Sequence, residues 1–218
     1  MRIAKESMPY LVVGLTVALA AAALGFPFLS GGAFALSAFV AYFFRDPRRE
    51  VPRDPDAVVS PGDGRVVEVH RDETGRTHIA IFLSLFDVHI NRAPAAGTVR
   101  KLDYRSGRFL PANHGKAGIE NERNEMTLET EHGEIRLAQI AGVIARRIVC
   151  WKRVGDRVEA GERIGLIQFG SRLEVVLPAG IPAAVAVGDR VQGGSSILAR
   201  NPAAAAVQER RLEEASTR

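Results

Sequence analysis

The chain has 218 residues, 46% of them hydrophobic and 25% charged, so it can bury a substantial core and is too apolar to be globally disordered. Its single cysteine, Cys150, excludes an intramolecular disulfide and any paired-cysteine metal or redox motif. The formal net charge is +4, but the basic residues are interspersed with acidic ones, and no basic run carries interleaved aromatic residues. We therefore expect no nucleic-acid partner.

The N-terminal segment Ser7–Phe44 contains no charged residue. Glycine, proline and serine interrupt it at Gly25–Gly32, which leaves two slightly short apolar spans. Basic residues flank both ends, a pattern that places both ends on the cytoplasmic side of a membrane. We expect a membrane-associated helical hairpin at residues 1–49, attached to the cytoplasmic face of the cell membrane. An interfacial or re-entrant hairpin is the alternative, and the second apolar block argues against a cleaved signal peptide.

Several arginines follow this segment, and two interpretations of them stay open. They either set the orientation of the hairpin or contact anionic lipid headgroups, and the first interpretation is favoured. These residues are Arg45, Arg48, Arg49 and Arg53.

Beyond a charged, proline-rich linker, the sequence shows short β signals and no long helical period. Apolar and polar residues alternate most clearly at 125–130 and 134–139, which are joined by a Glu-His-Gly turn and predict a β-hairpin. We expect a mainly β (α+β) domain at residues 50–200, built as a compact antiparallel barrel or sandwich. The remaining residues, 201–218, form a polar tail.

A repeat lies within this domain, because the pattern Val-Gly-Asp-Arg-Val-x-x-Gly-x-x-Ile occurs at 154–164 and again at 187–197. Each copy predicts a strand–turn–strand unit, and two copies too small to fold alone are expected to pack together. The pattern is similar to that of lipoyl- and biotinyl-carrier domains. No lysine follows Lys152, so the attachment residue of a carrier is missing and the repeat is interpreted as scaffold.

Three strings carry polar residues at unusual places: Ser60–Gly64, Phe86–Pro94 and Phe169–Arg172. Taken singly, each has a structural explanation, since Asp63 suits a tight turn, His89 a satisfied buried histidine, and Gly170-Ser171 a β-bulge. The five histidines form no zinc-binding motif, so no metal is expected. Walker, dinucleotide-binding and serine-esterase motifs do not occur in the sequence.

Taken together, five ordered strings resemble the phosphatidylserine decarboxylase family in its short bacterial and archaeal form. The resemblance covers essentially residues 8–200. The strings are FFRDPRR (43–49), SPGDGRV (60–66), SLFDVHINRAP (84–94), IENERNE (119–125) and FGSRLEVVLP (169–178).

The resemblance implies a proenzyme that cleaves itself between Gly170 and Ser171. The products would be a β subunit, 1–170, and an α subunit, 171–218, which remain together as a heterodimer; a homodimer of these heterodimers stays open. Ser171 would become a covalent pyruvoyl group, the cofactor. That group would form a Schiff base with phosphatidylserine held in the bilayer, and the reaction would give phosphatidylethanolamine and CO2.

The resemblance also implies roles for three side chains. The Ser171 hydroxyl would attack the Gly170 carbonyl, with His89 as base and Asp63 as the acid that orients it. Longer members of the family carry two histidines three residues apart in this region, whereas here only His89 remains. The histidine matched by His89 need not be the cleavage base in those members, so a role in protonating the product carbanion is the alternative. His114 is the next candidate for a partner of Asp63.

Two further alternatives need to be separated from this interpretation. A second Gly-Ser bond, Gly194–Ser195, lies in the second repeat copy and is interpreted as a turn, because its counterpart is Gly161–Glu162. The competing function is a membrane-anchored, lipoyl-like β-barrel scaffold without catalysis. It would explain the hairpin and the repeat, but not the combination of Asp63, His89 and Gly170–Ser171.

Overall fold

The structure is a computed structural model that describes residues 2–107, 121–142, 147–168 and 171–202. The chain divides into two compact units. One consists of residues 1–48 with the short segment 86–88, and the other of residues 49–85 and 89–218.

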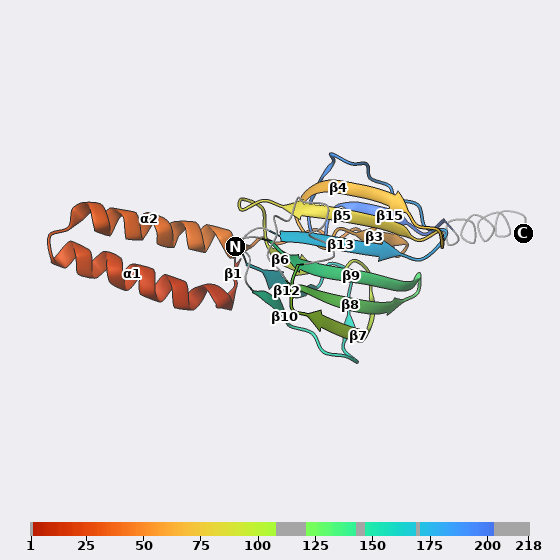
Figure 1. The fold of residues 1–218 in the computed structure, drawn as a ribbon, viewed down its shortest axis with the longest axis horizontal. Helices are drawn as coiled ribbons and strands as arrows, with labels where there is room; N and C mark the ends of the chain where they lie inside the picture. The colour runs from red at the N-terminus through yellow and green to blue at the C-terminus, as the bar shows by residue number, and fades with distance from the viewer. Residues whose placement is uncertain (1, 108–120, 143–146, 169–170, 203–218) are drawn as a thin grey trace, which may run out of the picture. The chain divides into compact units, whose positions relative to one another are not determined.

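The first unit is a helical hairpin. A short 3-10 helix, Lys5–Ser7, leads into α1 (Met8–Ala23), which turns back through Gly25 into α2 (Pro27–Phe43) (Figure 1). Gly25 has a φ of 76°, a backbone conformation that glycine adopts without strain. Strands β1 (Arg2–Ile3) and β2 (Arg45–Asp46) pair at the open end of the hairpin. Small residues let the helices approach closely, because a Cβ atom on Gly14 would lie 2.3 Å from Ser37 Oγ.

Large apolar side chains point outward from this hairpin. Phe28 is 95% exposed and Leu19 72% exposed. The helical segment Lys5–Ala23 is long enough and apolar enough to cross a membrane, whereas α2 is also apolar but shorter. A water-soluble helix pair would bury such an apolar surface, so the hairpin fits the predicted membrane association.

The second unit is built on an eight-stranded antiparallel sheet that curls into a half-barrel (Figure 1). Its strands follow the order β11 (Arg157–Val158), β7 (Gly97–Arg105), β8 (Arg123–Thr130), β9 (Gly133–Ala141), β13 (Ser171–Leu177), β5 (Thr77–Leu83), β4 (Gly64–Arg71) and β14 (Arg190–Val191). Two small antiparallel sheets complete the unit: β10 (Ile148–Cys150), β12 (Arg163–Ile167) and β6 (Ile90–Arg92), and then β15 (Ile197–Arg200) with β3 (Ala57–Val59).

The sequence therefore predicted the fold class correctly, as mainly β with an N-terminal pair of helices. The predicted hairpin is the β8–β9 pair, in which Thr130 lies opposite Gly133 and Gly133 has a φ of 99°. The barrel is only half closed, because the large sheet ends at the two-residue strands β11 and β14.

The predicted repeat organises the whole β unit. In the first copy, the amide of Gly161 donates to Ala93 O at 2.8 Å, and in the second the amide of Gly194 donates to Ser60 O at 2.7 Å. The partner segments of the two copies, 56–66 and 89–99, are also offset by 33 residues. They exchange matching hydrogen bonds, from Val59 N–H to Pro94 O and from Arg92 N–H to Pro61 O, both 2.8 Å long.

The unit is thus pseudo-symmetric, with β9 and β13 at the centre of the strand order. The large core lies on the concave face of the sheet. On β13 the fully buried residues alternate with residues on the other face, as a strand requires. Leu173, Val175 and Leu177 belong to this core, and burying each such side chain contributes about 1.5–3 kcal/mol.

Candidate active site

Ser171 is the first residue of β13 and lies on the inner face of the sheet, in line with Leu173. It pairs with Leu83 of β5 and with Ala141 of β9. Its side chain is fully buried, and Oγ has no hydrogen-bond partner in the described part of the chain. A buried hydroxyl without a partner costs about 1–3 kcal/mol, so its presence calls for a functional reason. Gly170 lies outside the described residues.

The SPGDG string forms a loop against the same end of β13. A Cβ atom on Gly62 would lie 2.5 Å from Leu173 Cδ1, so only glycine lets the loop approach this closely. Ser60 Oγ donates to Gly62 O at 2.7 Å and holds the loop in shape. The hydrogen bond from Arg92 N–H to Pro61 O joins this loop to the strand that follows His89. The fold therefore gathers three of the strings singled out in the sequence around the start of β13.

Asp63 is held by a guanidinium group. Its carboxylate accepts two hydrogen bonds from Arg49 Nη2, at 2.7 and 2.6 Å, and one from Gly193 N–H at 2.9 Å. The side chains are 17% exposed for Asp63 and 10% for Arg49. This contact places the Arg49 guanidinium group within the site. Neither of the two roles expected for the arginines after the hairpin, orienting the hairpin or contacting lipid headgroups, included it.

His89 is 2% exposed and directly precedes β6. Its backbone carbonyl accepts a hydrogen bond of 3.3 Å from Ile167 N–H. Ser171 Oγ is unpartnered within the described residues, so it bonds to neither His89 nor Asp63 there, and the Asp63 carboxylate is bonded to Arg49 and Gly193. His114 lies outside the described residues.

A chain of buried amides crosses the concave face beside these residues. Asn124 Nδ2 donates to Gln139 Oε1 at 2.9 Å, and Gln139 Nε2 donates to Asn91 Oδ1 at 2.8 Å. All three side chains are at least 95% buried. The sequence analysis did not single out any of them as functional, although Asn91 and Asn124 stand inside the VHINRAP and NERNE strings.

The NERNE string also fixes the neighbour of Ser171. Asn121 Nδ2 donates to Ala141 O at 2.7 Å, and Ala141 N–H donates to Glu122 O at 2.9 Å. Glu122 is hydrogen-bonded to Tyr104, and this bond, assisted by burial, raises the pKa of the Tyr104 hydroxyl above its usual range. The string therefore holds the end of β9 that pairs with Ser171.

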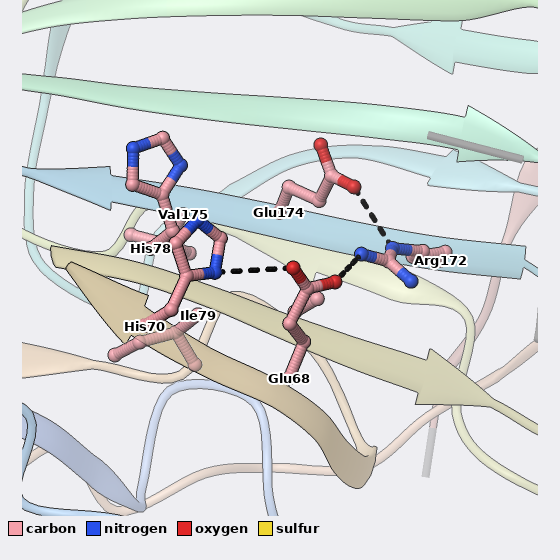
Figure 2. Close-up of a pocket in the computed structure, with 8 residues that line it drawn as sticks. Glu68, His70, His78, Ile79, Arg172, Glu174 and Val175 are labelled. Atoms are coloured by element: carbon pink, nitrogen blue, oxygen red, sulfur yellow. Dashed lines mark hydrogen bonds and ion pairs between the residues drawn. The ribbon is translucent and has the colours of Figure 1, made fainter. Parts of the chain in front are cut away.

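The outer face of the sheet carries a separate small pocket of about 120 Å³ (Figure 2). Arg172, the residue after Ser171, lies in it with a side chain only 8% exposed and binds Glu68 at 2.5 Å and Glu174 at 2.8 Å. The rings of His70 and His78 stack at its other end with centroids 4.7 Å apart. Since Ser171 faces the opposite side of the sheet, this pocket supports the strand and does not open onto the serine.

The His78 end of this pocket is anchored by Asp72. Hydrogen bonds from His78 and then from Thr74 hold the pKa of the Asp72 carboxyl well below its usual range. Among the described residues, no group of three or more His, Cys, Asp or Glu side chains could hold a metal ion.

Comparisons of the sequence with known proteins point to one family. Residues 36–199 match the family model described as phosphatidylserine decarboxylase. A phosphatidylserine decarboxylase proenzyme from Solibacter usitatus (strain Ellin6076) is 48% identical over 189 residues, which cover 84% of this chain and 92% of that protein. A protein of the same name from Syntrophus aciditrophicus (strain SB) is 43% identical over 204 residues, covering 90% of this chain and 96% of that protein.

Proposed function

Because the chain belongs to the phosphatidylserine decarboxylase family and is therefore a carboxy-lyase, we propose that it matures by cleaving itself between Gly170 and Ser171. The products are a β subunit of residues 1–170 and an α subunit of residues 171–218. The observation that supports this best is the fully buried hydroxyl of Ser171, which has no partner among the described residues and lies where three family strings meet.

Self-cleavage begins with the Ser171 hydroxyl. Oγ attacks the carbonyl carbon of Gly170, the peptide C–N bond breaks, and the hydroxyl proton passes through a base to the freed amine, which leaves an ester. Loss of the Ser171 α-proton then expels the Gly170 carboxylate. The dehydroalanine that remains takes up water and releases ammonia, so residue 171 ends as a pyruvoyl group. His89 is the proposed base and Asp63 the proposed acid that orients it.

For that pairing, the Asp63 carboxylate has to accept a hydrogen bond from His89. In the described conformation it accepts from Arg49 and Gly193, and a carboxylate has room for a further donor. Hydrogen bonds of catalytic groups often tighten only when the reacting groups are in place. Arg49 would then stabilise the negative charge of the Asp63 carboxylate together with His89.

The site fits the pyruvoyl group that cleavage would create. Residue 171 begins a strand held on both sides by β5 and β9, so the new terminus stays fixed after the bond is cut. The group would supply a conjugated carbonyl that takes up the electrons left when CO2 departs from phosphatidylserine. His89 would protonate the product carbon if it is not needed as the cleavage base.

The helical hairpin would keep this site at its substrate. Phosphatidylserine retains its acyl chains in the bilayer, so an enzyme that acts on its headgroup benefits from a membrane anchor. The outward-facing apolar residues of α1 and α2 suit that role. We propose that the hairpin attaches the β unit to the cytoplasmic face of the membrane, and that the α and β subunits remain a heterodimer, with or without further pairing into a dimer of heterodimers.

A denaturing gel of the purified protein tests this function. The wild-type chain should separate into two fragments with a boundary at 170/171, while Ser171→Ala should give one full-length band and still fold. A matched variant, Ser195→Ala, removes the hydroxyl of the other Gly-Ser bond and should leave cleavage unchanged. A single wild-type band would favour the alternative function, a membrane-anchored β scaffold without catalysis.

A further inference from the structure

Two buried polar atoms stand out at the same end of the concave face. Asn91 Nδ2 and Ser171 Oγ both belong to fully buried residues, and both are without a hydrogen-bond partner within the described ranges. Buried donors are almost always paired in folded proteins, so an unpaired amide on the same face as an unpaired nucleophile points to a donor that serves a further atom during the reaction.

The amide chain fixes which end of Asn91 is free. Gln139 Nε2 donates to Asn91 Oδ1, and Gln139 itself is oriented because its Oε1 accepts from Asn124. If the Asn91 amide were turned over, its NH2 would face the NH2 of Gln139 and the bond would be lost. The chain therefore presents Nδ2, a donor, away from Gln139.

The position of Nδ2 follows from Gly62. The point that a Cβ atom on Gly62 would occupy is 3.7 Å from Asn91 Nδ2, 3.5 Å from Leu83 Cδ2 and 2.5 Å from Leu173 Cδ1. Leu83 is the residue paired directly with Ser171, and Leu173 is the next inward-facing residue on β13. Nδ2 thus lies over the start of β13, where the Ser171 side chain faces inward.

The pseudo-symmetry of the unit shows that the scaffold does not need an amide there. The position equivalent to Asn91 in the other half is Val58, which is fully buried within the hydrophobic core. The same backbone therefore accepts an apolar residue, and the polar residue occurs only in the half that faces Ser171.

We propose that Asn91 is a catalytic residue whose Nδ2 donates a hydrogen bond to the oxygen that becomes negatively charged during self-cleavage. This inference rests on the proposed function. When Ser171 Oγ bonds to the carbonyl carbon of residue 170, the electron pair of the carbonyl moves to its oxygen, and it returns when the C–N bond breaks. That carbon is bonded to the nitrogen of Ser171, so the oxygen is confined to the neighbourhood of Ser171. Asn91 transfers no proton and lowers the barrier through the hydrogen bond.

Self-cleavage kinetics test the proposal directly. The full-length chain is synthesised in a cell-free system, and the appearance of fragments is followed on denaturing gels. Asn91→Ala should slow cleavage by about 10²–10³-fold, the usual effect of removing one oxyanion donor. The control is Thr77→Val at the far end of β5, which removes another buried hydrogen bond, from Thr77 Oγ1 to Ile181 O at 2.7 Å, and should cleave at the wild-type rate.

Asn91→Asp separates catalysis from packing. Its carboxyl can still accept from Gln139, but its second oxygen donates only when protonated. Cleavage by Asn91→Asp should therefore exceed that by Asn91→Ala at acidic pH, and the ratio of the two rates should fall as the carboxyl ionises. The other charged or titratable groups around this site are the same in both variants, so a pH-dependent change in the ratio reports the carboxyl at position 91: Arg49, Asp63, His89, Arg92, Glu122 and Arg163.

The outcomes distinguish the two levels of the account. No cleavage by the wild-type chain would contradict the proposed function itself. Wild-type cleavage with Asn91→Ala as fast as Thr77→Val, or with Asn91→Asp no faster than Asn91→Ala at any pH, would overturn the role of Asn91 alone.

Discussion

The two halves of the β unit share a backbone and differ in chemistry. Segments 56–66 and 89–99 pair with the two repeat copies through corresponding hydrogen bonds. Three equivalent pairs nevertheless differ in kind: Asp63 and Ala96, Gly62 and Ala95, and Val58 and Asn91. The scaffold is thus duplicated, while each polar or conformationally special residue of the site occurs in one half only. Exchanges between equivalent positions can therefore separate what folds the unit from what acts in it.

The largest effect is expected for the proposed acid–base pair. Asp63→Ala and His89→Ala should each slow self-cleavage by about 10²–10⁴-fold, because an uncatalysed serine hydroxyl is a poor nucleophile. Ala96→Asp, the matched change in the other half, should leave the cleavage rate unchanged. The measurement is the half-time of fragment formation on denaturing gels.

The same experiment can show that Asp63 and His89 do not act together in self-cleavage. If His89→Ala cleaves at the wild-type rate while Asp63→Ala does not, Asp63 works with another base, and His114 is the next residue to test. A cleaved His89→Ala protein that fails to decarboxylate phosphatidylserine would assign the histidine to the mature site.

A smaller effect is expected from Gly62. Gly62→Ala would place a methyl group 2.5 Å from Leu173 Cδ1 and should lower the free energy of unfolding by about 1–3 kcal/mol through overpacking. Ala95→Gly, at the equivalent position, should cost only about 0.5–1 kcal/mol. Urea denaturation of both variants in the cleavage-deficient Ser171→Ala background gives the comparison. Equal losses would show that the loop does not need glycine to approach β13.

The two central strands offer a further matched pair. Arg172 on β13 is 8% exposed and binds both Glu68 and Glu174, whereas Arg136 on β9 is 42% exposed and binds Glu134 at 2.9 Å. Arg172→Met should lower the free energy of unfolding by about 1–2 kcal/mol, discounted for the partly exposed Glu68, and Arg136→Met by less than about 0.5 kcal/mol. In the cleaved protein, Glu68 and Arg172 would belong to different subunits, so Arg172→Met should also release the α subunit at lower urea concentration. Release of the α subunit at the same urea concentration in Arg172→Met and in the wild-type protein would contradict this role.

The smallest expected effect is at Asp72. Its carboxyl has a lowered pKa in the folded protein, so its contribution to stability is complete above the ordinary value of 3.8 and is lost as the pH falls below it. Asp72→Asn should therefore lower the urea midpoint slightly at pH 7 and have less effect at pH 3. An equal shift at both pH values would show that the contact with His78 does not depend on the carboxylate charge.

Local patterns made most of the fold predictable. Alternation with a Glu-His-Gly turn predicted the β8–β9 hairpin, and the loss of charge over Ser7–Phe44 predicted the helices. The sequence analysis did not recognise that the partner segments 56–66 and 89–99 also form a repeat. Their strings SPGDGRV and APAAGTV show the same offset as the two copies that were found. Only proline, one glycine and the final valine are shared, so the similarity is visible mainly in the hydrogen bonds.

The site was predictable only where a string is unusual by itself. Asp63, His89 and Ser171 stand in distinctive contexts, and the fold brings their segments together. Arg49 and Asn124 stand in strings that carry the resemblance, but neither they nor Gln139 could be given a role, because those roles depend on contacts between residues 14, 15 and 48 positions apart. A buried amide chain of this kind arises from sheet register, which a single sequence does not specify.

Intact mass spectrometry of the purified wild-type protein tests the central claim most directly. We expect two species whose boundary lies between residues 170 and 171, with the smaller one lighter than the unmodified 171–218 peptide by the mass of one ammonia. A smaller fragment that retains an ordinary N-terminal serine, or a boundary at any other bond, would contradict the origin of the active group in Ser171.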